Sequence, residues 1–404
     1  MPELMMDLAD SLPSDDAILV GRVWMPGDIP GPSIVSLVGH DVYDMTPVFP
    51  TMSDLLEQDD AAELARQTGS CKRVCSVSEL LANSVESVRD PSKPYLLSPV
   101  DLQAIKACGV TFMVSLIERV IEEKAAGDLR QAAVLRESLT DTIGESLLNI
   151  KPGSSQAEAL KRALIDKGIW SQYLEVAIGP DAEVFTKAQV LSSVGRGASI
   201  GVHPASQWNN PEPEIVLAVN SRGNIMGATL GNDVNLRDFE GRSALLLGSA
   251  KDNNASCAIG PFIRLFDGSF NLDTIRRCIV SLDIEGEDGF SLSGTSHMAE
   301  ISRSPEELVA HSRNEHHYFP DGFVLFLGTM FVPTQDRDRP GMGFTHKVGD
   351  VVTISTPSLG RLMNRVDYTH RIAPWTFGVR SLFRNLMARG LADRVLALGR
   401  EKPV

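Results

Sequence analysis

Apolar side chains between residues 100 and 170 recur at helical intervals. The first set is separated by three, four or seven residues, which places its members on one face of a helix: Leu102, Ile105, Phe112, Leu116 and Val120. Gly109 would weaken the middle of that helix. A second set has similar spacing: Leu129, Ala132, Leu135, Leu139, Ile143 and Leu147. Both patterns predict helices that pack against a core.

After about residue 180 the pattern changes to short apolar runs separated by Gly, Asn, Asp and Pro, which is typical of strands. The clearest runs are Glu214–Val219, Cys278–Asp283, Phe323–Leu327 and Asp350–Ser355. A last helix is expected from Phe377 to about Arg389. Residues 1–95 predict irregular strands and turns. The chain is therefore expected to be α+β, with a mixed N-terminal domain over residues 1–178 and a strand-rich domain over residues 179–404.

Composition removes several classes of function. The chain has 38 Lys and Arg against 52 Asp and Glu, a formal charge of −14, so its surface should repel a nucleic-acid backbone. No run of about 18 apolar residues is present, so no membrane partner is expected. Five scattered cysteines suit reduced thiols, and the acidic N-terminus does not resemble a secretory signal. These features predict a cytoplasmic protein.

Three places in the strand-rich half carry charged residues that could bind a metal ion or take part in catalysis. Glu212 and Glu214 begin an apolar run, and residues two apart in a strand share a face at about 6–7 Å. Two carboxylates at that spacing repel unless a cation or solvent lies between them. Asp233 and Lys251 follow in loop-like stretches. Hard oxygen ligands without His or Cys favour Mg²⁺, Mn²⁺ or Ca²⁺ over zinc.

Each of these features also has an ordinary explanation. An isolated Glu-x-Glu is most often a solvated strand end. Asp233 could cap its own turn, and Lys251 could be a surface lysine in a loop. Their order along the chain favours a shared functional site over three separate ordinary explanations.

That order, Glu-x-Glu, then Asp, then Lys, resembles the fumarylacetoacetate hydrolase superfamily over roughly residues 100–370. The resemblance implies a hydrolase-like mixed β-sandwich or β-roll C-terminal catalytic domain and a smaller mixed N-terminal domain. It also implies Mg²⁺ or Mn²⁺ bound by Glu212, Glu214 and Asp233, with Lys251 beside the substrate. The stretch LGT resembles the Gly-Thr that the family places at the substrate, here Gly328 and Thr329.

Hydrolases of this superfamily often carry a lid segment of the form Gly-x-Asn-Tyr-x-x-His-x-x-Glu, whose His and Glu activate water. The matching lid segment here is residues 109–118, GVTFMVSLIE, with Ser115 in place of the His and Glu118 retained. A serine without an adjacent base activates water poorly. This difference argues against carbon–carbon hydrolysis.

Longer stretches resemble the dehydratases of 2-keto-3-deoxy-D-pentonate within the superfamily, among them WNNPEPEIVLAV. The resemblance implies cation-dependent loss of water to give 2-oxoglutarate semialdehyde in oxidative breakdown of D-xylose or D-arabinose, by a homodimer or homotetramer. Lys251 would stabilise an enolate or move a proton, near a cation that lowers its pKa. Glu118 would be a second acid or base, Lys187 would face a carboxylate, and Ser115, Gly328 and Thr329 would contact the substrate.

Two other functions stay open at this stage. The first is hydrolysis of acylpyruvates or 2,4-diketo-3-deoxy sugar acids, with Glu118 alone orienting water. The second is a non-catalytic module that holds a metal ion and a 2-keto acid. Product analysis separates the first from dehydration, because hydrolysis yields two acids.

Overall fold

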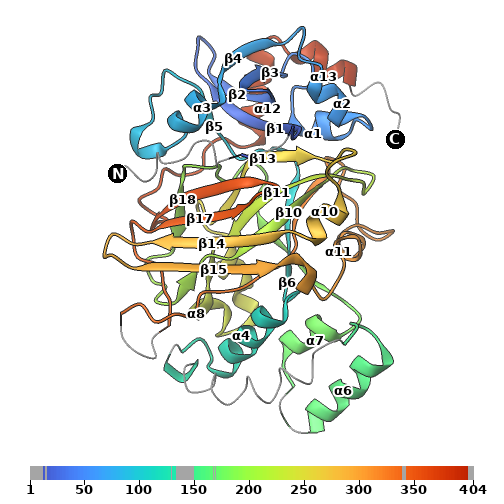
Figure 1. Ribbon diagram of the computed structural model, residues 1–404, viewed down its shortest axis with the longest axis vertical. Helices are drawn as coiled ribbons and strands as arrows, with labels where there is room; N and C mark the ends of the chain where they lie inside the picture. Colours follow the sequence, from blue (N-terminus) through green and yellow to red (C-terminus); the bar gives the residue numbers. More distant parts are fainter. Residues whose placement is uncertain are drawn as a thin grey trace.

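The computed structural model describes residues 12–13, 16–128, 130–132, 150–166, 168, 170–338 and 343–398. Figure 1 shows three tiers along the long axis of the molecule. The N-terminal strands lie at the top together with the C-terminal helices, the main strands fill the middle, and helices α4, α6 and α7 lie at the bottom. In the described part of the chain, no helix is both long enough and apolar enough to cross a bilayer.

The top tier joins the two ends of the chain. Its antiparallel strands are β1 (Leu19–Met25), β2 (Gly31–Val38), β3 (Asp41–Asp44) and β4 (Lys72–Ser76). Its helices are α1 (Met52–Leu56), α2 (Ala61–Arg66), α3 (Val77–Asn83), α12 (Val379–Ala388) and α13 (Ala392–Leu398). Thr51 and Ser76 start α1 and α3 with reciprocal capping hydrogen bonds. The described part of residues 1–95 thus contains regular strands and helices joined by turns.

Most strands belong to two sheets. In the described residues, one sheet has eleven strands in the order β4-β3-β2-β1-β13-β11-β10-β16-β6-β7, with β5 (Tyr95–Leu96) beside β1. Its central strands are β6 (Ala104–Gly109), β7 (Glu183–Ala188), β10 (Pro213–Val219), β11 (Ile225–Asp233), β13 (Cys257–Leu265) and β16 (Phe323–Phe326). The second sheet has five strands: β15 (Ser291–His297), β14 (Ile279–Glu285), β17 (Val351–Thr356), β18 (Gly360–Tyr368) and β8 (Ser199–Val202).

Strand β10 shows how the core is built. Ile215, Leu217 and Val219 join a buried cluster with residues of β14 and β17, so this face packs between the two sheets. Val216 and Ala218 point the other way, into a second cluster that includes residues of β6, β13 and β16. A strand buried on both faces reads as a continuous apolar run, and this is why EIVLAV was recognisable. The strands predicted to begin at residues 214, 278, 323 and 350 are confirmed as β10, β14, β16 and β17, with starts within one residue and ends within two.

The helix predicted through Leu102, Ile105, Phe112, Leu116 and Val120 is wrong in its first half. Residues 104–109 form β6, which pairs in parallel with β16 and antiparallel with β7. Val110 has a positive φ of 56°, and helix α4 starts only at Met113. Gly109 therefore ends a strand and does not weaken a helix. Pairing with strands distant in sequence overrode the local spacing, which is ambiguous over short runs.

The remaining helices lie mostly at the ends of the sheets. α4 (Met113–Lys124), α6 (Ser155–Asp166) and α7 (Gln172–Ile178) form the bottom tier. The other helices are α8 (Arg237–Glu240), α9 (Leu247–Lys251), α10 (Leu272–Arg276) and α11 (Pro305–Ser312). The predicted helical set from Leu129 to Leu147 lies, except for Ala132, outside the described residues. The C-terminal helix is confirmed as α12.

The mixture of sheets and separate helices confirms the predicted α+β class. The division at residue 178 stays a prediction. The large sheet takes β6 from one side of that position and β7 from the other. A third, two-stranded sheet pairs β9 (Asn209–Asn210) with β12 (Asn235–Leu236), next to the charged residues singled out above.

Candidate metal centre and active site

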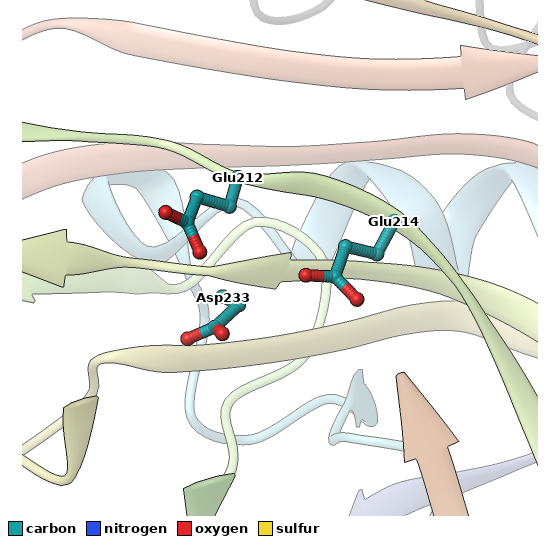
Figure 2. A group of neighbouring side chains, drawn as sticks. All are labelled: Glu212, Glu214 and Asp233. Carbon is teal, nitrogen blue, oxygen red and sulfur yellow. The ribbon is translucent and has the colours of Figure 1, made fainter. Parts of the chain in front are cut away.

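Three carboxylates come together at the end of neighbouring strands. Glu212 lies just before β10, Glu214 is the second residue of β10, and Asp233 is the last residue of β11 (Figure 2). One oxygen atom from each lies within 4.8 Å of the others, and all three residues are fully buried or nearly so. This burial excludes the alternative of a solvated strand end. Three buried acids this close require a cation, protons or both.

The strand register produces this convergence. β10 and β11 are antiparallel, with Pro213 opposite Asn232, and the Asp233 amide donates to the Glu212 carbonyl at 3.0 Å. Glu212 and Asp233 are thus cross-strand neighbours, which share a face of the sheet. Glu214 lies two residues along the same strand and on the same face. The Glu-x-Glu spacing and the distant Asp become one cluster for this reason.

The predicted Gly328 and Thr329 contact a carboxylate of the cluster. The Gly328 amide donates to Glu214 Oε2 at 2.7 Å, and Thr329 Oγ1 lies 3.4 Å from Glu214 Oε1. Gly328 has φ of +105°, and a Cβ there would lie 2.0 Å from Thr111 Oγ1. Both the backbone angle and the contact therefore require glycine. These two residues orient Glu214, whatever else Thr329 binds.

Lys251, at the end of α9, bridges two members of the cluster. Its Nζ donates to Glu212 Oε2 at 2.5 Å and to Asp233 Oδ2 at 2.9 Å. Burial disfavours the charged form, but Asp233 and Glu212 outweigh it and raise the pKa of Lys251 above its ordinary value. The ammonium lies directly between two carboxylates, which favour its charged form. The lowered pKa expected beside a bound cation stays a prediction.

The surroundings shift the pKa values of the acids in opposite directions. Burial, followed by the charges of Asp233 and Glu212, raises the pKa of Glu214 well above its ordinary value. Burial acts on Glu212 as well, but Arg119 and Lys251 overcome it and lower the pKa of Glu212 to about 2. The cluster therefore combines a firmly ionised carboxylate with one that holds a proton when no other cation is near.

Lys187 is buried on the other side of Asp233. Its Nζ lies 2.9 Å from Asp233 Oδ1 and donates to the carbonyls of Val234, at 3.1 Å, and Lys251. All of these partners are protein atoms next to the cluster, and Lys187 does not line the cavity described below. The contacts support a role in holding Asp233 and Lys251 in place. The predicted contact with a substrate carboxylate stays a prediction.

A small cavity opens beside the cluster. Its walls include Glu212, Asp233, Lys251, Thr329 and Ser115. The Ser115 hydroxyl donates to the carbonyl of Phe112 at 2.8 Å, so it forms a hydrogen bond within the first turn of its own helix. Glu118 does not line this cavity, and its carboxylate lies 2.7 Å from Arg237 Nη2. The lid segment thus places Ser115 at the cavity wall, whereas Glu118 forms an ion pair with Arg237.

Sequence reasoning missed Glu183, which also lines the cavity. It stands opposite Gly109 in the β6–β7 pair, and its Oε2 would lie 1.9 Å from a Cβ at that glycine. Burial, reinforced by Glu240, raises the pKa of Glu183 to about 7. A carboxyl group with this pKa can accept or donate a proton near neutral pH. The signal was available, since Glu183 and Lys187 lie four residues apart on one strand.

Sequence reasoning also missed a group of buried ion pairs under the cluster. Arg119 contacts Glu122, Glu240 and Glu212, and Arg237 contacts Glu122 and Glu118. Arg237 also stacks on the Trp208 ring, with its guanidinium carbon 4.2 Å from the ring centre. Arg119 lies one helical turn after Ser115, so the helical period could have placed both on one face.

The residues of the cluster fit a hard divalent cation. Three carboxylates within 4.8 Å offer only oxygen, the donor that Mg²⁺ and Mn²⁺ prefer over sulfur or imidazole. A positive nitrogen already lies between two of them, which shows that the arrangement accommodates positive charge. Lys187, Lys251 and Arg119 pair with Asp233 and Glu212, whereas Glu214 accepts from the Gly328 amide. A divalent ion would supply positive charge beside Glu214.

Comparison with known proteins agrees with this geometry. Residues 178–367 match the family described as fumarylacetoacetate (FAA) hydrolase C-terminal. A probable 2-keto-3-deoxyxylonate dehydratase of Haloferax volcanii is 33% identical over 194 residues, which are 48% of this chain and 63% of that protein. A 2-dehydro-3-deoxy-D-arabinonate dehydratase of Saccharolobus solfataricus is 32% identical over 193 residues, 47% of this chain and 60% of that protein. The matches thus span somewhat under two thirds of these relatives.

A solved structure shows the same fold. A 2-keto-3-deoxy-D-arabinonate dehydratase complexed with magnesium and 2,5-dioxopentanoate aligns with 87% of this chain and 99% of its own, at 21% identity and a TM-score of 0.60. This likeness confirms the expected hydrolase-like fold with its mixed N-terminal part.

Proposed function

We propose that this chain, whose residues 178–367 match the C-terminal domain of the fumarylacetoacetate hydrolase family, is a divalent-cation-dependent dehydratase of 2-keto-3-deoxy-D-pentonate. The observation that carries the proposal is the buried cluster Glu212, Glu214 and Asp233 beside Lys251, next to a cavity where the lid segment presents Ser115 instead of a base. The two curated relatives, both named as dehydratases of 2-keto-3-deoxy sugar acids, support the choice of substrate.

The overall change is simple to balance. Loss of the C3 proton and the C4 hydroxyl as water leaves a double bond between C3 and C4, conjugated to the 2-oxo group. A proton then leaves C5 and one is added at C3, which gives the C4–C5 enol. This enol loses its hydroxyl proton and gains a proton at C4, which leaves an aldehyde at C5. The product is 2-oxoglutarate semialdehyde, also called 2,5-dioxopentanoate, the compound bound in the solved dehydratase. The same substrate arises from D-xylonate and D-arabinonate, because C2 and C3 no longer carry the stereochemistry that distinguishes them.

Glu212, Glu214 and Asp233 would hold Mg²⁺ or Mn²⁺. A bound divalent ion supplies Lewis acidity toward the carboxylate and 2-oxo oxygens of the substrate, which makes the C3 proton easier to remove. Lys251, whose ammonium lies beside Glu212 and Asp233 at the cavity wall, would stabilise negative charge that develops on the substrate. Thr329, already directed at Glu214, would donate to a substrate oxygen.

Proton transfer is best assigned to Glu183. It lines the cavity, and its pKa of about 7 suits both removal of a proton and its return. Glu118 is less suited, because Arg237 holds its carboxylate and it does not line the cavity. This assignment replaces the sequence-based choice of Glu118.

The decisive experiment incubates the protein with Mg²⁺ and a set of 2-keto-3-deoxy acids and identifies the products. Dehydration leaves one five-carbon product from a pentonate. Two acids from an acylpyruvate or a 2,4-diketo sugar acid would instead indicate carbon–carbon hydrolysis. Tight binding of pyruvate with Mg²⁺ and no turnover would indicate a binding module.

A substitution tests the cation site. We expect Glu214→Gln to abolish dehydration and its response to Mg²⁺ together, because the amide removes one of three anionic ligands from a buried site. The measurement is product formation after chelation and after Mg²⁺ is restored. Glu285→Gln, at an exposed position of β14, is the matched control and should leave both unchanged. Dehydration that persists in the chelated wild-type protein would remove the cation from the mechanism.

A further inference from the structure

One of the three acids is held from a helix that contributes no ligand itself. Arg119, from the middle of α4, donates from Nη2 to Oε1 of Glu212. The other oxygen of the same carboxylate accepts from Lys251 at 2.5 Å. Both oxygens of Glu212 are thus fixed by cations on different elements. Asp233 is held similarly between Lys187 and Lys251, whereas Glu214 is held by a backbone amide.

Arg119 is itself held in place by two further carboxylates. Its Nη1 lies 2.7 Å from Glu122 and 2.9 Å from Glu240. Glu122 then accepts from Arg237 Nε at 2.5 Å. Arg119 is about 5% exposed and Glu122 is fully buried, so these pairs act with little screening by solvent. The chain of contacts runs from the start of β10 through α4 to α8.

A substrate-binding role for Arg119 does not fit these contacts. The arginine borders the cavity, but its two terminal nitrogens already serve three protein carboxylates. A substrate carboxylate would have to displace one of them at the cost of leaving a buried acid unpaired. A role in fixing Glu212 uses the contacts as they stand.

We propose that Arg119 is a positioning residue for the cation site: it fixes one oxygen of Glu212 from α4, so that the carboxylate meets a divalent ion in one orientation and the ion in turn secures α4. The inference rests on the proposed function, because it takes the three carboxylates to be ligands. Partners that orient metal ligands in this way commonly contribute on the order of 10–100-fold to metal affinity.

The test is Mg²⁺ binding by the full chain, measured by isothermal titration calorimetry, in the wild-type protein and in Arg119→Gln, Arg119→Lys, Glu122→Gln and Arg242→Gln. We expect Arg119→Gln to weaken Mg²⁺ binding about 10–100-fold. Arg119→Lys should recover part of the loss, because it keeps the charge and one donor. Glu122→Gln should weaken binding less. Arg242 lies on the surface just beyond α8, where it donates to the Asp238 carbonyl and lies over the Phe239 ring, so its variant should bind like the wild type.

The outcomes distinguish failure of the positioning role of Arg119 from failure of the proposed cation site. Unchanged or tighter Mg²⁺ binding in Arg119→Gln overturns the positioning role, since tighter binding would mean that the arginine mainly repels the ion. Absence of Mg²⁺ binding in the wild type overturns the cation site itself. If Arg119→Gln does not fold, hydrogen exchange of the wild type decides. Mg²⁺ should slow exchange of the α4 amides, and no change there overturns the coupling to α4.

Discussion

The Glu183 carboxyl group occupies an unusual place for an acid, at the start of a strand and over a glycine of the neighbouring one. Gly109 leaves the space that its side chain fills. Burial and the nearby Glu240 raise its pKa from 4.5 to about 7. The native protein therefore binds a proton there that the unfolded chain releases at a lower pH. This has a consequence for stability that is independent of catalysis.

Stability without added cation should fall as pH rises from about 4.5 to about 7, because the native state holds more protons than the unfolded state over that interval. Below about 4.5 both states are protonated and Glu183 contributes no pH dependence. Glu183→Gln should remove this part of the slope. Urea unfolding of both proteins at several pH values measures it. Equal slopes in the two proteins would contradict the raised pKa.

Sequence reasoning located some of these residues and not others, for a physical reason. Glu212 and Glu214 share a face through the period of a strand, and Asp233 joined them through a family pattern. Glu183 and Arg119 reach the site through pairing of β6 with β7 and through the start of α4 after Val110. Local spacing relates Glu183 to Lys187 and Arg119 to Ser115, but it does not show that these residues meet at the site. Residues that depend on long-range pairing were therefore the ones missed.

At the level of elements, α4 has a central part in the site. It presents Ser115 to the cavity and Arg119 to Glu212 from successive turns. Its N-cap is Phe112, which offers no side-chain hydrogen bond, and the Ser115 hydroxyl bonds to the Phe112 carbonyl. The predicted helix began too early, at Leu102, because apolar residues keep a helical spacing through β6 into α4.

Position 115 offers a direct test of the choice between dehydration and hydrolysis. We expect Ser115→His to raise hydrolysis of an acylpyruvate above the wild-type background, because an imidazole at the cavity wall can activate water. Release of pyruvate from the acylpyruvate is the measurement. Val114→His, at an exposed position of the same helix, is the control. An unchanged rate in Ser115→His would weaken the argument that the missing histidine separates the two reactions.

On the scale of the whole molecule, the C-terminal helices close onto the first strands. Arg389, just after α12, donates to the Pro32 carbonyl at 2.6 Å and to the Ser33 hydroxyl at 2.7 Å. Asn385 donates to the Pro30 carbonyl at 2.8 Å. The sequence predicted α12 from its spacing, but the surface that it covers depends on the strand pairs of the top tier. That assembly could not be predicted from local patterns.

Arg389→Ala should lower the free energy of unfolding by roughly 1–3 kcal/mol, the contribution of hydrogen bonds from a charged group. The cation site lies in another tier, so Mg²⁺ binding and turnover should be unchanged. Chemical denaturation and product assays measure the two effects. Arg380→Ala, at an exposed position of α12, is the control. A loss of turnover at unchanged stability would show that the top tier takes part in the reaction.

The place of β6 between β16 and β7 bears on how the protein is made. Residues 104–109 leave the ribosome early, yet one edge of this strand pairs with Phe323–Phe326. During synthesis that edge stays without its partner until more than three quarters of the 404 residues have emerged. An apolar strand with an open edge is prone to pair with other chains. Production of soluble protein should therefore respond to slower translation, lower temperature or added chaperones more than the stability of the finished fold would suggest.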